Sequence, residues 1–260
     1  MIRSLAAVGV LLATAVTAGA AVQTKKITYK VGDVECQGYL AWDDAAAGPR
    51  PGVLVVHEFW GLNDYARKRA EQLAGLGYVA FAADMYGEGK ATVHPKEAAE
   101  MAGKVRANLE NWRARATAAL DVLKSQPQCD KTKLAAIGYC FGGSTALQLA
   151  LSGADLKAVV SFHGALPTPS EEDAKQVKAA ILVCHGGADT FIPEKVIKAF
   201  RDGLDKAGVK YEFVAYPGVV HSFTVPEADK VGNPGMKYDK AADEDAWKRM
   251  LKLFEEKMGK

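Results

Sequence analysis

The stretch Leu134-Ala-Ala-Ile-Gly-Tyr-Cys-Phe-Gly-Gly-Ser144 decides the fold of this chain. Residues 134–139 form an apolar run that predicts a buried strand, and residues 141–151 predict a helix directly after it. Glycines stand two positions before and two positions after Cys140. A side chain on a sharp strand-to-helix turn needs neighbours without bulk, because strand and helix approach closely there. The pattern therefore predicts a nucleophile elbow in which a cysteine occupies the position that serine usually holds.

The predicted elbow also gives Cys140 a defined chemical environment. It places the sulfur at the N-terminus of a helix, where the helix dipole and free N–H groups favour a thiolate. The alternative is a glycine-rich turn that carries a buried cysteine without a reactive role. The strand–turn–helix context favours the nucleophile.

Strand and helix patterns alternate on both sides of the elbow. Predicted strands cover residues 27–29, 34–42, 52–56, 78–83, 134–139, 158–162, 179–183 and 211–215. Predicted helices cover residues 64–76, capped by Asn63 or Asp64 and closed by Gly77, and residues 98–124, 141–151, 193–207 and 243–257. Such alternation requires crossover connections. We therefore predict an α/β fold of the α/β-hydrolase kind, with a mostly parallel central sheet and helices on both faces.

Length and composition fit one globular domain, which we place at residues 21–260. The chain has 260 residues, of which 49% are hydrophobic and 25% charged, and its formal net charge is +2. We find no internal repeat, low-complexity segment or linker. The dispersed, nearly balanced charge argues against a nucleic-acid or membrane-surface partner. We expect a monomer that acts on a small molecule.

The first 20 residues differ from the rest. Arg3 supplies a positive start, residues 5–16 form an uncharged run rich in Leu, Val and Ala, and Ala18-Gly19-Ala20 offers small residues for a peptidase. The run is too short to span a bilayer comfortably, since a spanning helix needs roughly 20 apolar residues. The pattern predicts a cleaved secretory signal peptide of bacterial style. We therefore expect the mature protein in the periplasm or outside the cell, with no membrane anchor.

The four cysteines admit two interpretations. An even number in an exported protein is compatible with disulfides, and Cys36 and Cys129 are the candidates for a bridge. Cys184 lies inside an apolar run, where a buried free thiol is the simpler interpretation. The sequence leaves the state of Cys36 and Cys129 open.

An acid and a histidine follow the elbow along the chain. Asp189 stands in a loop after the predicted strand 179–183, and His221 stands in a loop after the strand 211–215. The order nucleophile, acid, histidine is typical of the α/β-hydrolase fold. The alternative for Asp189 is capping of the helix near Pro193. The three residues together predict a triad of Cys140, Asp189 and His221.

The segment His57-Glu58-Phe59-Trp60-Gly61 follows the predicted strand 52–56. In this fold a backbone N–H at that turn is the second donor of the oxyanion hole. We assign the two donors to the N–H groups of Phe59 and Phe141. Glu58 is expected beside the sulfur, where a negative charge disfavours a thiolate. The alternative for Glu58 is a surface carboxylate on a loop.

These motifs resemble the dienelactone hydrolase family. His-Glu-x-x-Gly at 57–61, the elbow at 138–143, Gly-Ala-Asp at 187–189 and His-Ser-Phe at 221–223 carry the resemblance, which runs from about Lys26 to the C-terminus. It implies the family's fold and its Cys-Asp-His triad. It also implies that Glu58 is a gate, which keeps the resting thiol away from the histidine until substrate binds.

The chain departs from this family at two positions. The dienelactone enzymes proper hold the substrate carboxylate with two arginines, one shortly after the Asp-x-Tyr strand end and one four residues after the catalytic histidine. This chain offers Lys90 near the first position and Val225 at the second. A lysine does not reproduce the bidentate fork of an arginine. The departure puts chlorocatechol-pathway dienelactones in doubt as substrates.

Other residues receive weaker assignments. Trp60, Tyr86, His163 and Phe223 are candidates for the wall of a substrate pocket, with core packing as the alternative. For His163 the alternative is a hydrogen-bonded core histidine. The remaining histidines show no metal-ligand spacing, so we expect neither a metal nor a cofactor.

The sequence therefore predicts a hydrolase of carboxylic esters or lactones that works through a thioester. Two other classes remain open. A reactive cysteine in an exported protein also suits thiol redox chemistry, with Cys184 as the candidate resolving thiol. The third possibility is a binding module that keeps the fold without turnover.

Overall fold

Two long strands begin the part of the chain that this computed structural model describes, residues 22–45 and 47–259. Strands β1 (Val22–Val31) and β2 (Val34–Asp43) pair antiparallel along their whole length. Their turn contains Gly32, whose φ of +56° lies in the left-handed region that glycine adopts without strain. The predicted signal peptide, residues 1–20, lies outside the described residues.

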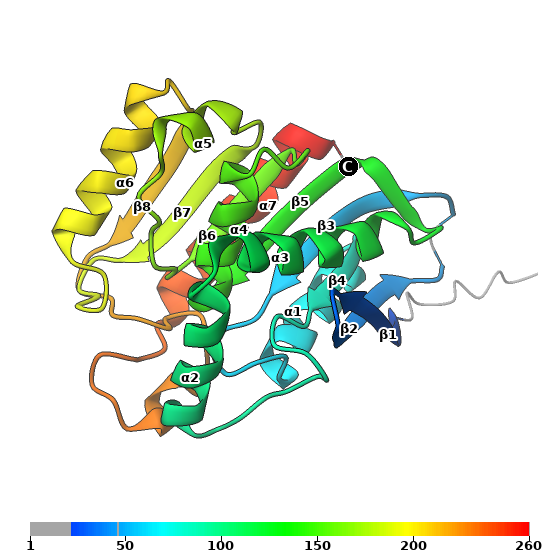
Figure 1. The fold of residues 1–260 in the computed structure, drawn as a ribbon, viewed down its shortest axis with the longest axis horizontal. Coiled ribbons are helices and arrows are strands. Elements are labelled where there is room, and N and C mark those ends of the chain that lie inside the picture. Colours follow the sequence, from blue (N-terminus) through cyan, green and yellow to red (C-terminus); the bar gives the residue numbers. More distant parts are fainter. Residues whose placement is uncertain (1–21, 46, 260) are drawn as a thin grey trace, which may run out of the picture.

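The hairpin joins one eight-stranded sheet in the order β1-β2-β4-β3-β5-β6-β7-β8 (Figure 1). The other strands are β3 (Arg50–Val56), β4 (Val79–Ala83), β5 (Cys129–Tyr139), β6 (Ala158–Phe162), β7 (Ala180–Gly186) and β8 (Tyr211–Tyr216). Strands β1, β2 and β4 pair antiparallel, and every pairing from β4 to β8 is parallel. The predicted mostly parallel sheet is confirmed.

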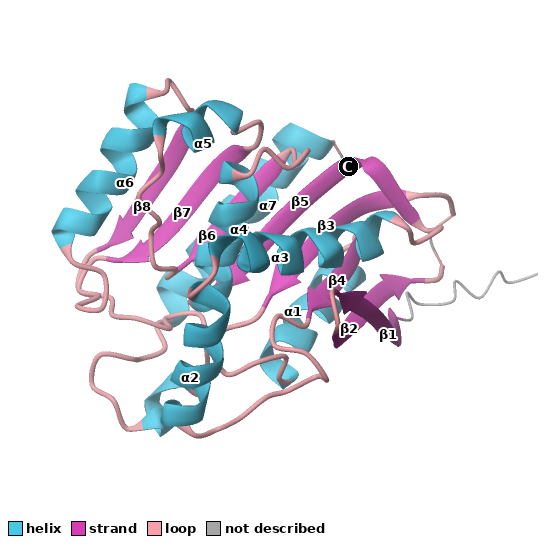
Figure 2. Ribbon diagram, viewed as in Figure 1, coloured by secondary structure: helices cyan, strands magenta, loops and turns pink. Residues whose placement is uncertain are grey.

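Helices cover both faces of this sheet, as Figure 2 shows. Helices α1 (Asp64–Gly75) and α7 (Lys240–Met258) pack on one face. The other face carries α2 (Pro95–Arg106), α3 (Leu109–Lys124), α4 (Phe141–Leu151), α5 (Glu171–Gln176) and α6 (Glu194–Lys206). The arrangement is the predicted α/β fold.

The central strands bury side chains on both faces. In β5, Leu134 and Ala136 belong to one apolar cluster, whereas Ala135, Ile137 and Tyr139 belong to the other. Successive side chains of a strand point to opposite faces, so this alternation follows directly from the strand geometry. Burial on both faces explains why β5 is a continuous apolar run in the sequence. A rigid core therefore holds the end of β5, where Cys140 follows.

The predicted helix 98–124 is wrong as one element, because two helices, α2 and α3, occupy its place. Asn108 has an extended conformation with φ −130° and ψ 107°, and its side chain accepts a hydrogen bond from the N–H of Asn111. An asparagine in this role satisfies a free N–H of the second helix. The first helix begins at Pro95, earlier than predicted, because proline suits the first helical position. The absence of a proline inside the segment concealed the break.

Two short elements were not predicted, the helix α5 and a 3-10 turn at Ala228–Val231. Both are shorter than the apolar periodicity needed to recognise a helix from sequence. None of the helices in the described part of the chain is long and apolar enough to cross a membrane.

Candidate active site

Cys140 stands on a strained turn between β5 and α4. Its φ of +52° and ψ of −113° place it in a region that non-glycine residues rarely adopt. A Cβ atom on Gly138 would lie 1.9 Å from the carbonyl oxygen of Gly142, and one on Gly142 would lie 2.1 Å from that of Val56. Both positions therefore require glycine, as the sequence pattern indicated. The turn presents the half-buried Cys140 at the N-terminus of α4.

Asp189, His221 and Cys140 form a connected chain. The Nδ1 of His221 lies 2.7 Å from Oδ2 of Asp189, and the Cys140 thiol lies close enough to the ring to act on its charge. Burial acts to lower the pKa of His221, but the charges of Cys140 and Asp189 together raise it to about 10. This pKa favours the imidazolium form of His221 beside the sulfur. These three residues come from three different loops.

The loops that carry the acid and the histidine are fixed by backbone hydrogen bonds. The N–H of Phe191 donates to Oδ1 of Asp189 at 2.9 Å, which turns the second oxygen to the histidine. The N–H of His221 donates to Gly235, and the carbonyl of His221 accepts from Lys237. Both members are therefore held before substrate arrives.

Phe191 is a site residue that the sequence did not reveal. Its ring meets that of His221 edge to face, with centroids 5.2 Å apart, and 48% of the residue is exposed. This exposed aromatic ring beside His221 marks the open side of the candidate site. The only sequence signal was its place two residues after Asp189.

Glu58 is buried rather than a surface carboxylate. It is 2% exposed, and its Oε1 accepts a hydrogen bond of 3.0 Å from the hydroxyl of Ser222. Burial raises the pKa of Glu58 to about 6, although His221 and Ser222 act in the opposite direction. In this arrangement Glu58 is bound to Ser222, while the thiol lies beside His221. Ser222 is a second residue that the sequence reasoning missed.

The backbone around Phe59 and Phe141 suits an oxyanion hole. Phe141 is the first residue of α4, so its N–H has no acceptor within the helix. The carbonyl of Glu58 faces the N–H of Gly61 and the ring of His57. Because the peptide is planar and trans, the N–H of Phe59 points the opposite way. The carbonyl of Phe59 accepts from the hydroxyl of Tyr86 at 2.9 Å, which fixes this turn.

Aromatic rings surround the buried side chain of Phe141. The rings of His57, Tyr86 and Trp112 lie within 5.9 Å of it, and the guanidinium of Arg106 lies 5.2 Å over its centroid. Burial raises the pKa of Tyr86, as does the charge of Cys140. This packing stabilises the first turn of α4 and so the position of the elbow.

The predicted pocket residues divide into two groups. Trp60 is half-buried and contacts Phe59, and Tyr86 is 9% exposed, so both border the site. Phe223 and His163 are fully buried and contact one another. For Phe223 the structure favours the alternative of core packing. His163 lies behind His221, with ring centroids 5.1 Å apart.

Lys90 does not point to a substrate site. It is exposed and forms an ion pair of 3.1 Å with Glu88. The preceding turn is held instead by Asp84, whose carboxylate accepts hydrogen bonds from the N–H groups of Gln37, Tyr86, Gly87 and Gly89.

Each of the four cysteines is a free thiol in the structure, including Cys36 and Cys129, which are both buried. Within residues 22–45 and 47–259, no group of three or more His, Cys, Asp or Glu side chains is arranged to hold a metal ion. His57 is buried, and its Nε2 accepts from the N–H of Met85.

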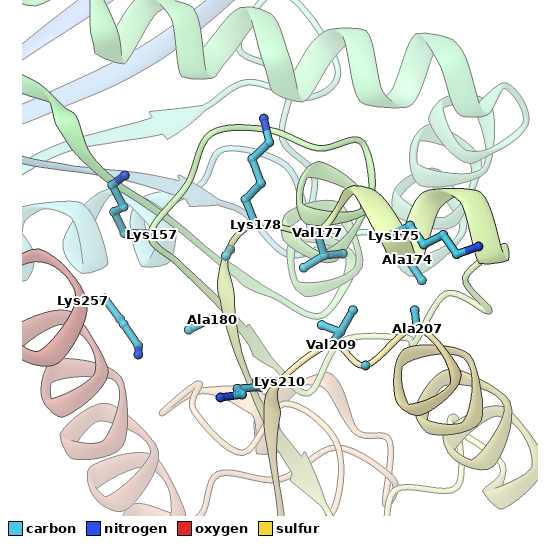
Figure 3. A pocket seen from close by; sticks show the side chains of 12 residues that line it. Lys157, Ala174, Lys175, Val177, Lys178, Ala180, Ala207, Val209, Lys210 and Lys257 are labelled. Carbon is cyan, nitrogen blue, oxygen red and sulfur yellow. The ribbon is translucent and has the colours of Figure 1, made fainter.

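A large surface pocket lies away from these residues (Figure 3). Its volume is about 530 Å³, and its lining includes Lys157, Lys178, Lys210 and Lys257 with an apolar floor around Val177. It contains none of the predicted site residues.

An eight-stranded, mostly parallel sheet with an elbow after β5 defines an α/β-hydrolase fold. The family model of the dienelactone hydrolase family matches residues 36–258. The chain belongs to the dienelactone hydrolase family and is a hydrolase of that type.

Relatives and solved structures agree with this assignment. A candidate carboxymethylenebutenolidase of Salmonella typhimurium is 31% identical over 234 residues, which are 85% of this chain and 83% of that protein. The crystal structure of a dienelactone hydrolase-like promiscuous phosphotriesterase from metagenomic libraries superposes with a TM-score of 0.89 at 41% identity, covering 92% of this chain and all of that one. A candidate dienelactone hydrolase of Klebsiella pneumoniae gives 0.75 at 26% identity, over 90% of this chain and 98% of that one.

Proposed function

We propose that this protein hydrolyses carboxylic esters or lactones with Cys140 as the nucleophile, His221 as the acid–base group and Asp189 as its orienting carboxylate. The observation that carries the proposal is the contact chain from Asp189 Oδ2 through the His221 ring to the thiol. A nucleophile within reach of a base, which is in turn oriented by a third group, is the arrangement that covalent catalysis requires.

The reaction proceeds in two halves. The Cys140 sulfur attacks the carbonyl carbon, and the resulting oxyanion binds the N–H groups of Phe59 and Phe141. His221 gives its proton to the departing alkoxide as the C–O bond breaks, which leaves a thioester on the sulfur. Water then loses a proton to His221 and attacks the thioester carbonyl. The carboxylic acid product leaves, and the thiolate–imidazolium pair is restored. Each oxyanion donor of this kind contributes about 3 kcal/mol to transition-state stabilisation.

Glu58 has a regulatory part in this proposal. A carboxylate near the thiol opposes formation of the thiolate, whereas a carboxylate bound to Ser222 leaves the thiol to His221. The Glu58 side chain therefore has two positions. In the open position its carboxylate is bound to Ser222, as in this structure, and in the closed position it lies beside the Cys140 sulfur. Keeping a resting thiol neutral also protects it from oxidation.

The substrate class follows from the family and from two departures. A relative bears the name carboxymethylenebutenolidase, which denotes a lactone hydrolase. Val225 carries no charge, and Lys90 is paired with Glu88. Neither residue therefore takes the place of the two arginines that bind the dienelactone carboxylate in the family. We therefore propose simple esters and lactones rather than chlorinated dienelactones.

The test is a panel of p-nitrophenyl esters and lactones, with wild type beside Cys140→Ala. We expect the variant to lose turnover by several orders of magnitude. Cys129→Ala is the matched control, because it removes a buried thiol at the far end of β5 and should leave turnover intact. Full activity of Cys140→Ala on these substrates contradicts the proposal.

A second activity has support from a solved structure. The metagenomic phosphotriesterase is 41% identical to this chain, and the match covers all of the phosphotriesterase and 92% of this chain. We propose that the same thiolate attacks the phosphorus of a dialkyl aryl phosphate, with the phosphoryl oxygen in the oxyanion hole. The P–O bond to the aryl group breaks as the S–P bond forms, and the aryloxide leaves with the proton of His221. Water then loses a proton to His221 and cleaves the S–P bond, which releases the dialkyl phosphate and restores the thiolate–imidazolium pair. A p-nitrophenyl phosphotriester assayed beside the esters tests this, and no release of nitrophenol above the Cys140→Ala background contradicts it.

The redox alternative has little support from geometry. Cys184 is fully buried in β7, and burial raises the pKa of its thiol to about 12. A neutral, enclosed thiol is a poor partner for thiol–disulfide exchange. The binding-module alternative predicts no turnover of any panel member.

We also propose that the protein is exported after removal of residues 1–20 and acts as a monomer. The mass of the mature chain from a periplasmic fraction tests the first point. Sedimentation of that material tests the second.

A further inference from the structure

His163 occupies a strained position behind the catalytic histidine. It directly follows β6, is fully buried, and has a φ of +40°. A non-glycine residue in this region costs of order 1–3 kcal/mol and is found where the surroundings enforce it. Its N–H is bound to the carbonyl of Cys184 at 2.8 Å. In this conformation the imidazole lies beside Glu58 and His221.

The two ring nitrogens of His163 have different surroundings. Nε2 lies 2.8 Å from the hydroxyl oxygen of Thr224. Nδ1 is buried without a hydrogen-bond partner among the described residues, and it lies 3.9 Å from Oε1 of Glu58. An unpartnered buried polar atom is costly, and one that faces a carboxylate calls for a functional explanation.

The surroundings of the two nitrogens indicate which one carries the proton. Nε of Arg69 donates to the Tyr65 hydroxyl at 3.2 Å, and that hydroxyl lies 2.7 Å from Oγ1 of Thr224. The Tyr65 hydroxyl donates to the Thr224 carbonyl at 3.1 Å, and that carbonyl also accepts from Nη2 of Arg69 at 2.9 Å. A lone pair on Nδ1 aimed at the Glu58 carboxylate would be repelled by it, so the favoured arrangement has the Thr224 hydroxyl donating to Nε2 of His163. A neutral imidazole that accepts at Nε2 carries its proton on Nδ1.

His163 remains neutral in this environment. Burial lowers its pKa well below the usual value, and the charges of His221, Arg69 and His185 lower it further. It therefore acts through the dipole of its Nδ1–H rather than through a full charge.

Several groups besides His163 face the Glu58 carboxylate. They are His221 and Ser222 in the loop after β8, Tyr139 at the end of β5, and Tyr65 on α1. Arg69, also on α1, lies over the rings of both tyrosines. Ser222 donates a direct hydrogen bond to Oε1 of Glu58, and Nδ1 of His163 lies 3.9 Å from the same oxygen. The Tyr139 hydroxyl, like His163 Nδ1, is buried without a hydrogen-bond partner among the described residues, but only His163 is recorded this close to the carboxylate.

We propose that His163 is a positioning residue for Glu58. Its Nδ1–H, with Nε2 placed against the Thr224 hydroxyl, holds the Glu58 carboxylate ionised and turned away from the Cys140 thiol. The catalytic consequence rests on the proposed function, whereas the tautomer and its effect on Glu58 do not. Loss of this donor favours the protonated carboxyl and the closed position beside the sulfur.

Two variants separate the positioning role from simple packing. His163→Asn keeps an amide donor near the place of Nδ1, and asparagine tolerates a positive φ. His163→Gln places its amide near Nε2, so it keeps a partner for Thr224 and loses the donor toward Glu58. The Glu58 carboxyl is titrated by ¹³C NMR in wild type and both variants. We expect His163→Gln to raise the Glu58 pKa by about one pH unit and His163→Asn to leave it near the wild-type value.

The same shift is expected in the acid limb of the kcat/KM profile for a p-nitrophenyl ester, where His163→Asn restores the wild-type limb. An unchanged or lowered Glu58 pKa in folded His163→Gln overturns the proposal. A ¹⁵N NMR spectrum of the wild-type imidazoles decides the matter should that variant not fold. We expect the His163 proton on Nδ1, and a proton on Nε2 overturns the proposal. These NMR measurements need no turnover, so an inactive wild type contradicts the proposed function and leaves this inference standing.

Discussion

Two buried carboxylates lie close to His221, and they are held in different ways. Asp189 is bound through both oxygens, one to the imidazole and one to the N–H of Phe191. Glu58 is bound through Oε1 to Ser222, and a second potential donor, His163 Nδ1, stands 3.9 Å from the same oxygen. A carboxylate with short bonds on two sides is a fixed support, whereas one with a single bond can change partner. The comparison assigns orientation of the histidine to Asp189 and control of the thiol to Glu58.

The largest effect is expected from Asp189→Asn. An amide at this position stabilises the wrong imidazole tautomer, and such a change lowers kcat about 10⁴-fold in a comparable triad. Steady-state kinetics on a p-nitrophenyl ester measure it. Glu58→Gln should cost far less in kcat, and an equal loss in both variants would break the distinction between the two carboxylates.

Removal of the thiol should reveal how His221 is charged. Because the charge of Cys140 raises the pKa of His221, Cys140→Ala should lower that pKa from about 10. The bond to Asp189 remains, so part of the elevation persists. An NMR titration of His221 in wild type and variant measures the change. A pKa that stays the same would show that the thiolate–imidazolium pair does not form.

Glu58→Gln should stabilise the folded protein at neutral pH. The pKa of Glu58 is raised from 4.5 to about 6, so the folded state favours the protonated form, and wild type loses stability as pH rises through that range. The loss amounts to about 2 kcal/mol above pH 6 and is absent in the amide variant. Urea unfolding at pH 5 and pH 8 measures it. A stability difference between wild type and variant that does not grow with pH would contradict a buried Glu58 carboxyl group with a raised pKa.

The smallest effect is expected from Ser222→Ala. This change removes the hydroxyl that donates to Glu58, so the Glu58 pKa should rise further, by about one unit or less. The acid limb of kcat/KM should move to higher pH by the same amount. Thr168→Ala, a change in the loop after β6, is a control that leaves the profile unchanged. A downward shift of the limb in Ser222→Ala would mean that Ser222 does not stabilise the carboxylate.

Much of the fold could be predicted because it depends on local patterns. The buried strands are continuous apolar runs, and the elbow needs Gly138 and Gly142 for a steric reason that is visible in the sequence. The break between α2 and α3 was missed because a single capping residue, Asn108, competes with an otherwise helical pattern.

The candidate site likewise combines features that the sequence predicts with contacts that only the structure shows. The order of Cys140, Asp189 and His221 along the chain was enough to predict that they lie at one site, since each follows a strand whose end lies at the same edge of the sheet. The bond between Glu58 and Ser222 joins residues 164 positions apart, and that between Tyr65 and Thr224 joins residues 159 apart. No local pattern encodes such contacts, so the hydrogen bonds that hold Glu58 could be found only in the structure.

The central claim is that Cys140 carries the acyl group, with the Asp189–His221 pair supporting it. The direct measurement is intact-protein mass spectrometry of wild type and Cys140→Ala, quenched in acid soon after mixing with a p-nitrophenyl ester. The account predicts a wild-type mass increase equal to the acyl group, located on the peptide that contains Cys140, and no increase in the variant. Turnover with no acyl adduct on Cys140, or an adduct of equal yield in the variant, would contradict it.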